Sequence, residues 1–200
     1  MSLRADFAII SSWIKPGTRV LDLGCGDGTL MHHLQNTRQV SGYGLEIDVD
    51  ELIACVGKGV NVIQTDLDKG LSSFASGAFD YVIMTEALQV LRRPDELLDD
   101  MLRVGRRVLV TFPNVGHWRC RLGLGLNGRM PMSRSLPNQW YNTPNIHLCT
   151  VRDFDQLCHQ KGIEVIQRSV VDFRHRSTLG ARLWPNLLGE IALYELRKPD

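Results

Sequence analysis

Short apolar segments alternate with helical patterns through the first half of the chain, and this alternation limits the possible folds more than any other feature. Five segments are predicted to be buried strands: residues 19–23, 40–46, 60–63, 79–84 and 107–112. Helical spacing of apolar residues separates them, most clearly from Pro94 to Val104, where a proline opens the helix. This pattern predicts an α/β protein with a parallel, doubly wound sheet.

The pattern changes after Phe112. Residues 113–150 form a segment rich in proline, glycine and aromatic residues, and a loop of this length in a compact domain is usually functional or disordered. Its aromatic residues favour order. A helix is expected to resume at Val151, and residues 163–171 and 191–196 alternate like strands. They would add an antiparallel edge, which gives a mostly parallel, seven-stranded sheet in a single domain of residues 1–200.

A glycine-rich turn follows the first predicted strand, in the sequence Asp22-Leu-Gly24-Cys25-Gly26-Asp-Gly28. Alternating glycines let the backbone pass close beneath a ligand, where a β-carbon would intrude. The spacing is G-x-G-x-G, whereas dinucleotide-binding turns have G-x-G-x-x-G with a pyrophosphate at the helix N-terminus. The two aspartates would repel a diphosphate but suit a ligand that carries an ammonium group.

Carboxylates also end the second and third predicted strands. Glu46 lies about 20 residues beyond the turn, where an acid hydrogen-bonds ribose hydroxyls, and Asp66 is placed to accept from an adenine amino group. These acids should converge on one crevice and indicate S-adenosylmethionine or S-adenosylhomocysteine binding. The alternative is that the glycines only shape a turn and the acids only cap helices. The expected cofactor-binding residues are Asp22, Gly24, Cys25, Gly26, Gly28, Glu46, Asp66 and Leu67.

The near-neutral net charge of +1 conceals an uneven distribution. Residues 1–100 carry 8 Lys/Arg against 15 Asp/Glu, whereas residues 101–200 carry 15 against 7. No acidic residue lies between Asp100 and Asp153. This basic region is either a solvated surface or a patch for carboxylates, phosphates or an acidic partner. Near-neutrality and the lack of any base-specific signature argue against a nucleic-acid partner.

The N-terminus lacks the uninterrupted apolar core of a signal peptide, and no run of about 18 apolar residues predicts a membrane span. The 5 cysteines show no C-x-x-C spacing, so neither structural disulfides nor a metal site is expected. A cytoplasmic protein without membrane association is therefore expected, with its cysteines acting as small apolar groups.

No catalytic constellation can be assigned from the sequence. Methyl transfer often needs a base within hydrogen-bond reach of the acceptor. His117, Tyr141 and His147 lie in the 113–150 segment and are weak candidates for that role. A histidine beside a tryptophan is more often a packed structural residue. Trp118, Trp140 and Tyr141 could equally anchor a protein interface.

The glycine turn and its acids resemble the class I S-adenosylmethionine-dependent methyltransferases, which have a Rossmann-like fold. Longer motifs resemble the MetW family of methionine-biosynthesis proteins over almost the whole chain: residues 112–119, 128–131, 136–149 and 152–154. One departure is Glu86-Ala-Leu-Gln89, where Gln-x-Leu-Gln is expected. The resemblance implies a role beside homoserine O-acyltransferase, as an accessory or regulatory partner, with no established methyl-transfer reaction.

The leading hypothesis is therefore an accessory protein that binds S-adenosylmethionine and supports or regulates homoserine O-acyltransferase, with residues 113–150 as the docking surface. The alternative is an active methyltransferase whose small anionic acceptor is held by the arginines of that segment. A nucleotide-dependent oxidoreductase is disfavoured by the glycine spacing and the acidic turn.

Overall fold

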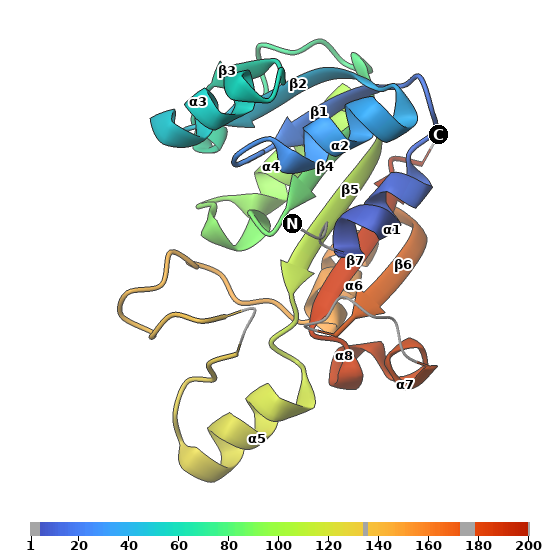
Figure 1. The fold of residues 1–200 in the computed structure, drawn as a ribbon. Helices are drawn as coiled ribbons and strands as arrows, with labels where there is room; N and C mark the ends of the chain where they lie inside the picture. Colours follow the sequence, from blue (N-terminus) through green and yellow to red (C-terminus); the bar gives the residue numbers. More distant parts are fainter. Residues whose placement is uncertain (1–4, 134–135, 173–178, 200) are drawn as a thin grey trace.

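The computed structural model describes residues 5–133, 136–172 and 179–199, and its centre is a seven-stranded sheet (Figure 1). The strands are β1 (Arg19–Leu23), β2 (Ser41–Glu46), β3 (Val62–Gln64), β4 (Phe79–Thr85), β5 (Gly105–Pro113), β6 (Glu164–Val171) and β7 (Ile191–Arg197). Their order is β3-β2-β1-β4-β5-β7-β6. The first five strands pair in parallel, and β7 is antiparallel to both β5 and β6. The predicted mostly parallel sheet with an antiparallel edge is confirmed.

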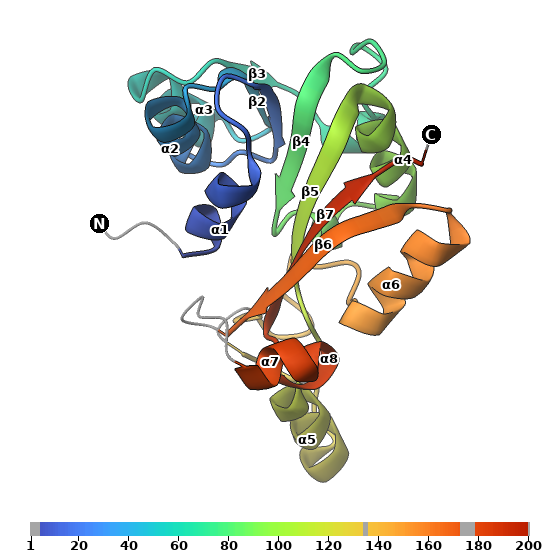
Figure 2. The ribbon, with the colours of Figure 1, turned by 90° about the vertical axis from the view of Figure 1, so that its right-hand side faces the viewer.

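Helices cover both faces of this sheet (Figure 2). The α-helices are α1 (Ala5–Trp13), α2 (Thr29–Arg38), α3 (Val49–Gly57), α4 (Pro94–Val104), α5 (Trp118–Asn127), α6 (Val151–Gln160), α7 (Leu179–Leu183) and α8 (Pro185–Leu188). Two 3-10 helices, η1 (Leu67–Lys69) and η2 (Leu88–Val90), follow strands β3 and β4. One core lies between the sheet and helices α4 and α6, and a second lies between the sheet and helices α1 and α2.

The central strands supply both cores because their side chains alternate between the two faces. In β4, Val82 and Met84 belong to the core under α4, whereas Tyr81 and Ile83 belong to the core under α1 and α2. All four are buried. Strands buried on both faces have near-continuous apolar sequences, which explains why these segments could be recognised.

Strand β3 begins two residues later than predicted. Val60 is buried beside α3 rather than paired with β2, and its amide donates to Cys55 O at 3.0 Å. It therefore closes the end of α3, and pairing with β2 starts only at Val62.

The segment between β5 and α6, residues 114–150, is called the insert below. It leaves the carboxyl end of β5, and helix α5 projects away from the sheet (Figures 1 and 2). Asn114 holds both ends of the insert. Its Nδ2 donates to Gly189 O at 2.7 Å, and its Oδ1 accepts from the amides of Gly116 at 3.0 Å and Val151 at 3.2 Å. The long loop predicted here thus contains a helix and has a fixed base.

Within the described residues, none of the helices combines the length and the apolar character needed to cross a membrane.

Candidate functional site

The glycine-rich turn connects β1 to α2 at the carboxyl edge of the sheet. Gly24, Gly26 and Gly28 have φ values of +67°, +52° and +73°, a region that L side chains rarely adopt. The amide of Gly24 donates to Leu45 O at 2.8 Å and so fixes the turn against β2.

The three glycines have different surroundings. A β-carbon at Gly24 would lie 3.3 Å from the Ala87 side chain, and one at Gly28 would lie 2.8 Å from Cys55 Sγ. At Gly26 a β-carbon would meet no described atom within 4 Å beyond its chain neighbours. The open position at Gly26 is therefore the point of the turn that a ligand could approach most closely.

Glu46, the last residue of β2, is bonded to this turn. Its Oε2 accepts from the Gly26 amide at 2.9 Å, and its Oε1 accepts from the amides of Ile47 at 2.8 Å and Asp48 at 3.1 Å. An ionised carboxylate offers about four acceptor sites, so roughly one remains for a further donor. Glu46 thus both shapes the turn and keeps limited capacity for a ligand hydroxyl.

Asp22 lies beneath the turn and is 1% exposed. Its Oδ1 has no hydrogen-bond partner among the residues that the structure describes. Burial, followed by the negative charge of Glu46, raises the pKa of Asp22 to about 7. An unpaired buried carboxyl with this pKa would be stabilised in its ionised form by a cationic ligand group.

Asp66 follows β3 and caps η1, with its Oδ1 accepting from the Asp68 amide at 3.0 Å. The Thr65 amide donates to Glu46 O at 2.9 Å, so the ends of β2 and β3 are joined beside the turn. Leu67 is partly buried against the core and would lie 3.9 Å from a β-carbon at Gly24. All eight predicted cofactor-binding residues therefore lie at one edge of the sheet.

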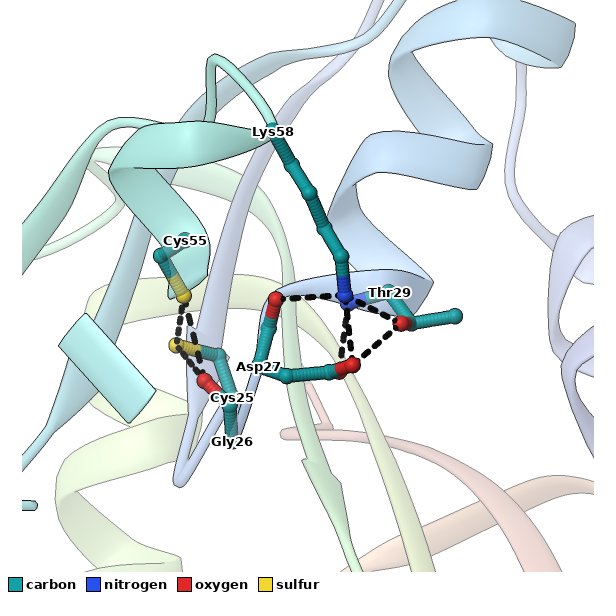
Figure 3. Close-up of polar contacts among 6 residues, drawn as sticks. All are labelled: Cys25, Gly26, Asp27, Thr29, Cys55 and Lys58. Carbon is teal, nitrogen blue, oxygen red and sulfur yellow. Dashed lines mark hydrogen bonds and ion pairs between the residues drawn. The ribbon is translucent and has the colours of Figure 1, made fainter. Parts of the chain in front are cut away.

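The Asp27 side chain points toward Lys58 and Thr29 (Figure 3). It is therefore not directed at a cationic ligand, as the sequence suggested. Lys58, just after α3, contacts its side chain and also donates to Asp27 O at 2.9 Å and to Thr29 Oγ1 at 2.7 Å. Burial alone would raise the pKa of Asp27, but hydrogen bonds from Lys58 and Thr29 lower it. Asp27 is thus a structural carboxylate paired with Lys58, whereas Asp22 has a buried oxygen without a partner among the described residues. Sequence reasoning missed Lys58, because no motif links it to the turn.

Cys25 and Cys55 pack under the turn, with their sulfur atoms 3.8 Å apart (Figure 3). The Cys55 thiol donates to Gly26 O at 3.1 Å. Burial raises the pKa of both thiols, which keeps them protonated. A β-carbon at Gly44 would come within 2.4 Å of Cys25 Sγ, so this strand glycine, also missed from the sequence, makes room for the thiol.

The three candidate catalytic residues occupy separate places in the insert. His117 is buried at its base, 3.9 Å from Glu190 Oε1, and burial followed by the charge of Arg119 lowers its pKa. Tyr141 is exposed beside Trp140. The ring of His147 lies 3.3 Å from Arg92 O. None of these contacts joins the three residues to the glycine turn, and their catalytic role stays a prediction.

The strand order, the reversed β7 and the glycine turn with an acid at the end of β2 define a class I methyltransferase-like protein. The more particular assignment comes from the sequence family. The model of the family described as "Methionine biosynthesis protein MetW" matches residues 4–196, and the chain belongs to that family.

Similar proteins agree with this assignment. The chain is 32% identical over 209 residues to the "Bifunctional methionine biosynthesis protein MetXA/MetW" of Rhodopirellula baltica. The alignment includes the whole of this chain but only 34% of the length of that relative. An S-adenosylmethionine-dependent methyltransferase from Archaeoglobus fulgidus superposes with a TM-score of 0.70 at 17% identity, covering 98% of this chain and 92% of that one. Phosphoethanolamine N-methyltransferase 2 of Haemonchus contortus, solved with S-adenosyl-L-methionine, gives 0.69 at 16% identity, covering 98% and 52%.

Proposed function

We propose that this chain is an accessory protein of methionine biosynthesis that binds S-adenosylmethionine and supports or regulates homoserine O-acyltransferase. The observation that carries the proposal is the Rhodopirellula relative, in which a MetW-like part and a MetXA part share one chain. Fusion into one chain is an arrangement that suits two proteins acting together. The MetW resemblance supplies the identity of the proposed partner.

The ligand half of the proposal is supported by the fit of the glycine-turn residues. The unpaired Asp22 carboxylate would face a positive group, Gly26 would allow close approach, and Glu46 would accept a ribose hydroxyl. Asp66 would accept from the adenine amino group. When bound, S-adenosylmethionine carries an activated methyl group on a cationic sulfur. The residues of this site bind and orient such a ligand, and none is assigned a chemical step.

The partner half is supported by the surface of the insert. Large apolar side chains are exposed along α5 and the following loop, including Leu122, Leu126, Met132, Trp140 and Tyr141. Apolar patches of this kind mark interaction sites, and interfaces are enriched in tryptophan, tyrosine, methionine and arginine. The arginines between Asp100 and Asp153 are not balanced by any acidic residue in that segment. The resulting positive charge would suit an acidic rim on the partner.

The proposal is tested by mixing the full-length protein with purified homoserine O-acyltransferase and measuring the mass of the species by size-exclusion chromatography with light scattering. We expect a complex, together with a changed acyltransferase rate. The S-adenosylmethionine half is measured separately by calorimetry on the protein alone. Two separate species and an unchanged rate would reject the partner, whereas no heat of binding would reject the ligand.

An active methyltransferase remains the alternative, and one observation favours it. Arg119, Asn127 and Arg129 line a hollow of about 440 Å³ beside α5, where a small anion could be held. Incubation of the protein with a labelled methyl donor and cell extract separates the two functions. A labelled small-molecule product supports the methyltransferase, and its absence supports the accessory role.

A further inference from the structure

Helix α3 has an apolar face that the rest of the described chain leaves largely uncovered. Val49, Ile53 and Val56 recur at intervals of four and three residues, so they lie on one side of the helix. All three side chains are exposed, Ile53 to 65%. A different side of α3 packs on the core through the buried Cys55. Apolar side chains grouped in this way lose free energy to water and mark an interaction site.

The charges beside this face are negative. Asp48 caps α3, and Asp50 and Glu51 lie in its first turn. Neither Asp50 nor Glu51 forms an ion pair within the described parts of the chain, and Lys58, the cation just after the helix, is already paired with Asp27. Two α3 faces brought together would place like charges side by side. The face therefore suits a surface that is apolar at its centre and basic at its edges.

Helix α5 has a surface of this complementary kind. Trp118, Leu122 and Leu126 recur at every fourth residue and form one exposed ridge, with Leu126 exposed to 79%. Arg119 and Arg121 are exposed on either side of the ridge, and the helix contains no acidic residue. Side chains at four-residue spacing on two helices interlock in the commonest class of helix packing. The α5 ridge and the α3 face thus match in both shape and charge.

The two helices cannot meet within one molecule. Helix α3 lies beside the β3 edge of the sheet, whereas α5 projects from the opposite end of the molecule (Figures 1 and 2). A contact between α3 and α5 must therefore join two copies of the chain. Such a contact brings together two different surfaces of identical molecules, so substitutions on either surface can be tested separately.

We propose that the apolar face of α3 in one copy docks on the α5 ridge of a second copy, with the arginines of α5 near the acids of α3. Three side chains from each helix make a small contact, which corresponds to a weak interface with a Kd on the order of 100 µM. The association needs neither S-adenosylmethionine nor the acyltransferase. Because α5 belongs to the insert that is proposed to dock on the acyltransferase, the two associations would exclude one another.

Sedimentation velocity of the unmodified full-length protein, without ligand or partner, tests the association over a concentration range that spans this Kd. We expect the mean mass to rise above that of a monomer as the concentration increases. It should fall again when salt is added, because screening weakens the attraction between the charged edges. A monomer at every concentration would overturn the proposal.

Two variants test which surfaces make the contact. Ile53→Asp and Leu122→Asp each place a charge in the middle of one apolar surface, at exposed positions that do not belong to the core. Each variant alone should associate at least about tenfold more weakly. An equimolar mixture should recover association, because it contains one intact α3 face and one intact α5 ridge. Asn127→Asp adds the same charge to α5 away from the ridge and should associate normally.

Association that survives either Ile53→Asp or Leu122→Asp would overturn the pairing of α3 with α5. A mixture that associates no better than the separate variants would overturn it as well. Should the unmodified protein stay monomeric while Ile53→Asp loses capture of the acyltransferase, the α3 face would belong to that enzyme and not to a second copy.

Discussion

The amide of Gly26 donates a 2.9 Å hydrogen bond to Oε2 of Glu46, a residue twenty positions later in the chain. Glu46, the acid expected to accept a hydrogen bond from a ribose hydroxyl, thus also holds the glycine turn in place. The proposed ligand contact and the shape of the turn share this carboxylate, so substitutions of Glu46 are expected to affect both affinity and stability.

Glu46→Ala should abolish measurable S-adenosylmethionine binding and lower the free energy of unfolding by about 1–3 kcal/mol, because the amides of Gly26, Ile47 and Asp48 lose their acceptor. Glu46→Gln keeps one acceptor oxygen, so it should lose less stability while affinity still falls at least about tenfold. Calorimetry and urea unfolding measure the two effects. Asp50→Asn, an exposed change in the first turn of α3, is the matched control. Unchanged affinity in Glu46→Ala would place the ligand elsewhere.

Asp22 should make ligand binding depend on pH. Its carboxyl is raised to a pKa of about 7 in the free protein, and a cationic ligand favours the ionised form. Affinity should therefore rise as the pH increases from 6 to 8, and Asp22→Asn should bind weakly with a flat profile. Calorimetry across this range measures the effect. A profile that is equally steep in Asp22→Asn would assign the titration to another group.

The raised pKa of Asp22 should also make the free energy of unfolding fall as the pH rises, whereas ligand affinity rises. The unfolded chain ionises Asp22 near its ordinary value of 3.8, whereas the folded protein holds the proton up to about 7. Between these values the unfolded state loses the proton first, so this group lowers stability as the pH rises and its effect levels off above 7. The difference in unfolding free energy between the protein and Asp22→Asn should follow this course.

Lys58→Met should loosen the turn from outside, since the ammonium group contacts Asp27 O, the Asp27 carboxylate and Thr29 Oγ1. Both partners of the ion pair are partly exposed, so the loss of stability should stay below about 1 kcal/mol. Affinity for S-adenosylmethionine should fall several-fold, and Lys58→Arg should restore part of it. Lys69→Met is the control on a neighbouring segment. A normal affinity in Lys58→Met would show that the turn keeps its shape unaided.

Trp118→Ala and Arg119→Glu should weaken association with homoserine O-acyltransferase while leaving S-adenosylmethionine affinity unchanged. Trp118 is 39% exposed, and the Arg119 guanidinium lies 5.4 Å from the centre of its ring. A loss of at least about tenfold in affinity is typical of such anchors. Arg106→Ala, at the opposite end of β5, controls for loss of positive charge. Undiminished capture of the acyltransferase would move the interface away from α5.

S-adenosylmethionine occupancy could report methionine sufficiency to the acyltransferase. Coupling between two ligands is reciprocal, so the acyltransferase should change S-adenosylmethionine affinity by the same factor that S-adenosylmethionine changes acyltransferase affinity. Calorimetry with and without saturating partner measures the first factor. Equal affinities would reject this sensor function while leaving each separate binding event intact.

The sheet and the grouping of the strand-end acids could be predicted because central parallel strands have continuous apolar sequences and their carboxyl ends meet at one edge. Helix α5 could not, since Leu122, Leu124 and Leu126 are exposed and give no one-sided apolar pattern. The short helices α7 and α8, of 5 and 4 residues, depend on tertiary contacts rather than on local sequence.

Asp27 shows a different limit of sequence reasoning. Its position in the turn favours a ligand role, but only the folded chain brings Lys58 close enough to neutralise it. Asp22 presents the reverse case, because its importance comes from burial and from the lack of a partner for Oδ1 within the described structure. The sequence shows which acids lie near the turn. Only the packing of the folded chain shows that Asp27 is paired with Lys58 and that Asp22 Oδ1 lacks a partner among the described residues.

Asn114 joins the two ends of the insert at the edge of the sheet. One side chain bonds to the amide of Gly116 at the entrance and of Val151 at the exit, so the two ends of the insert stay together whatever lies between them. Lengthening or shortening the exposed part of that chain is expected to leave the pairing of the seven strands unchanged. A change in the insert is therefore expected to alter the proposed docking surface without moving the glycine turn, which is built from β1 and β2.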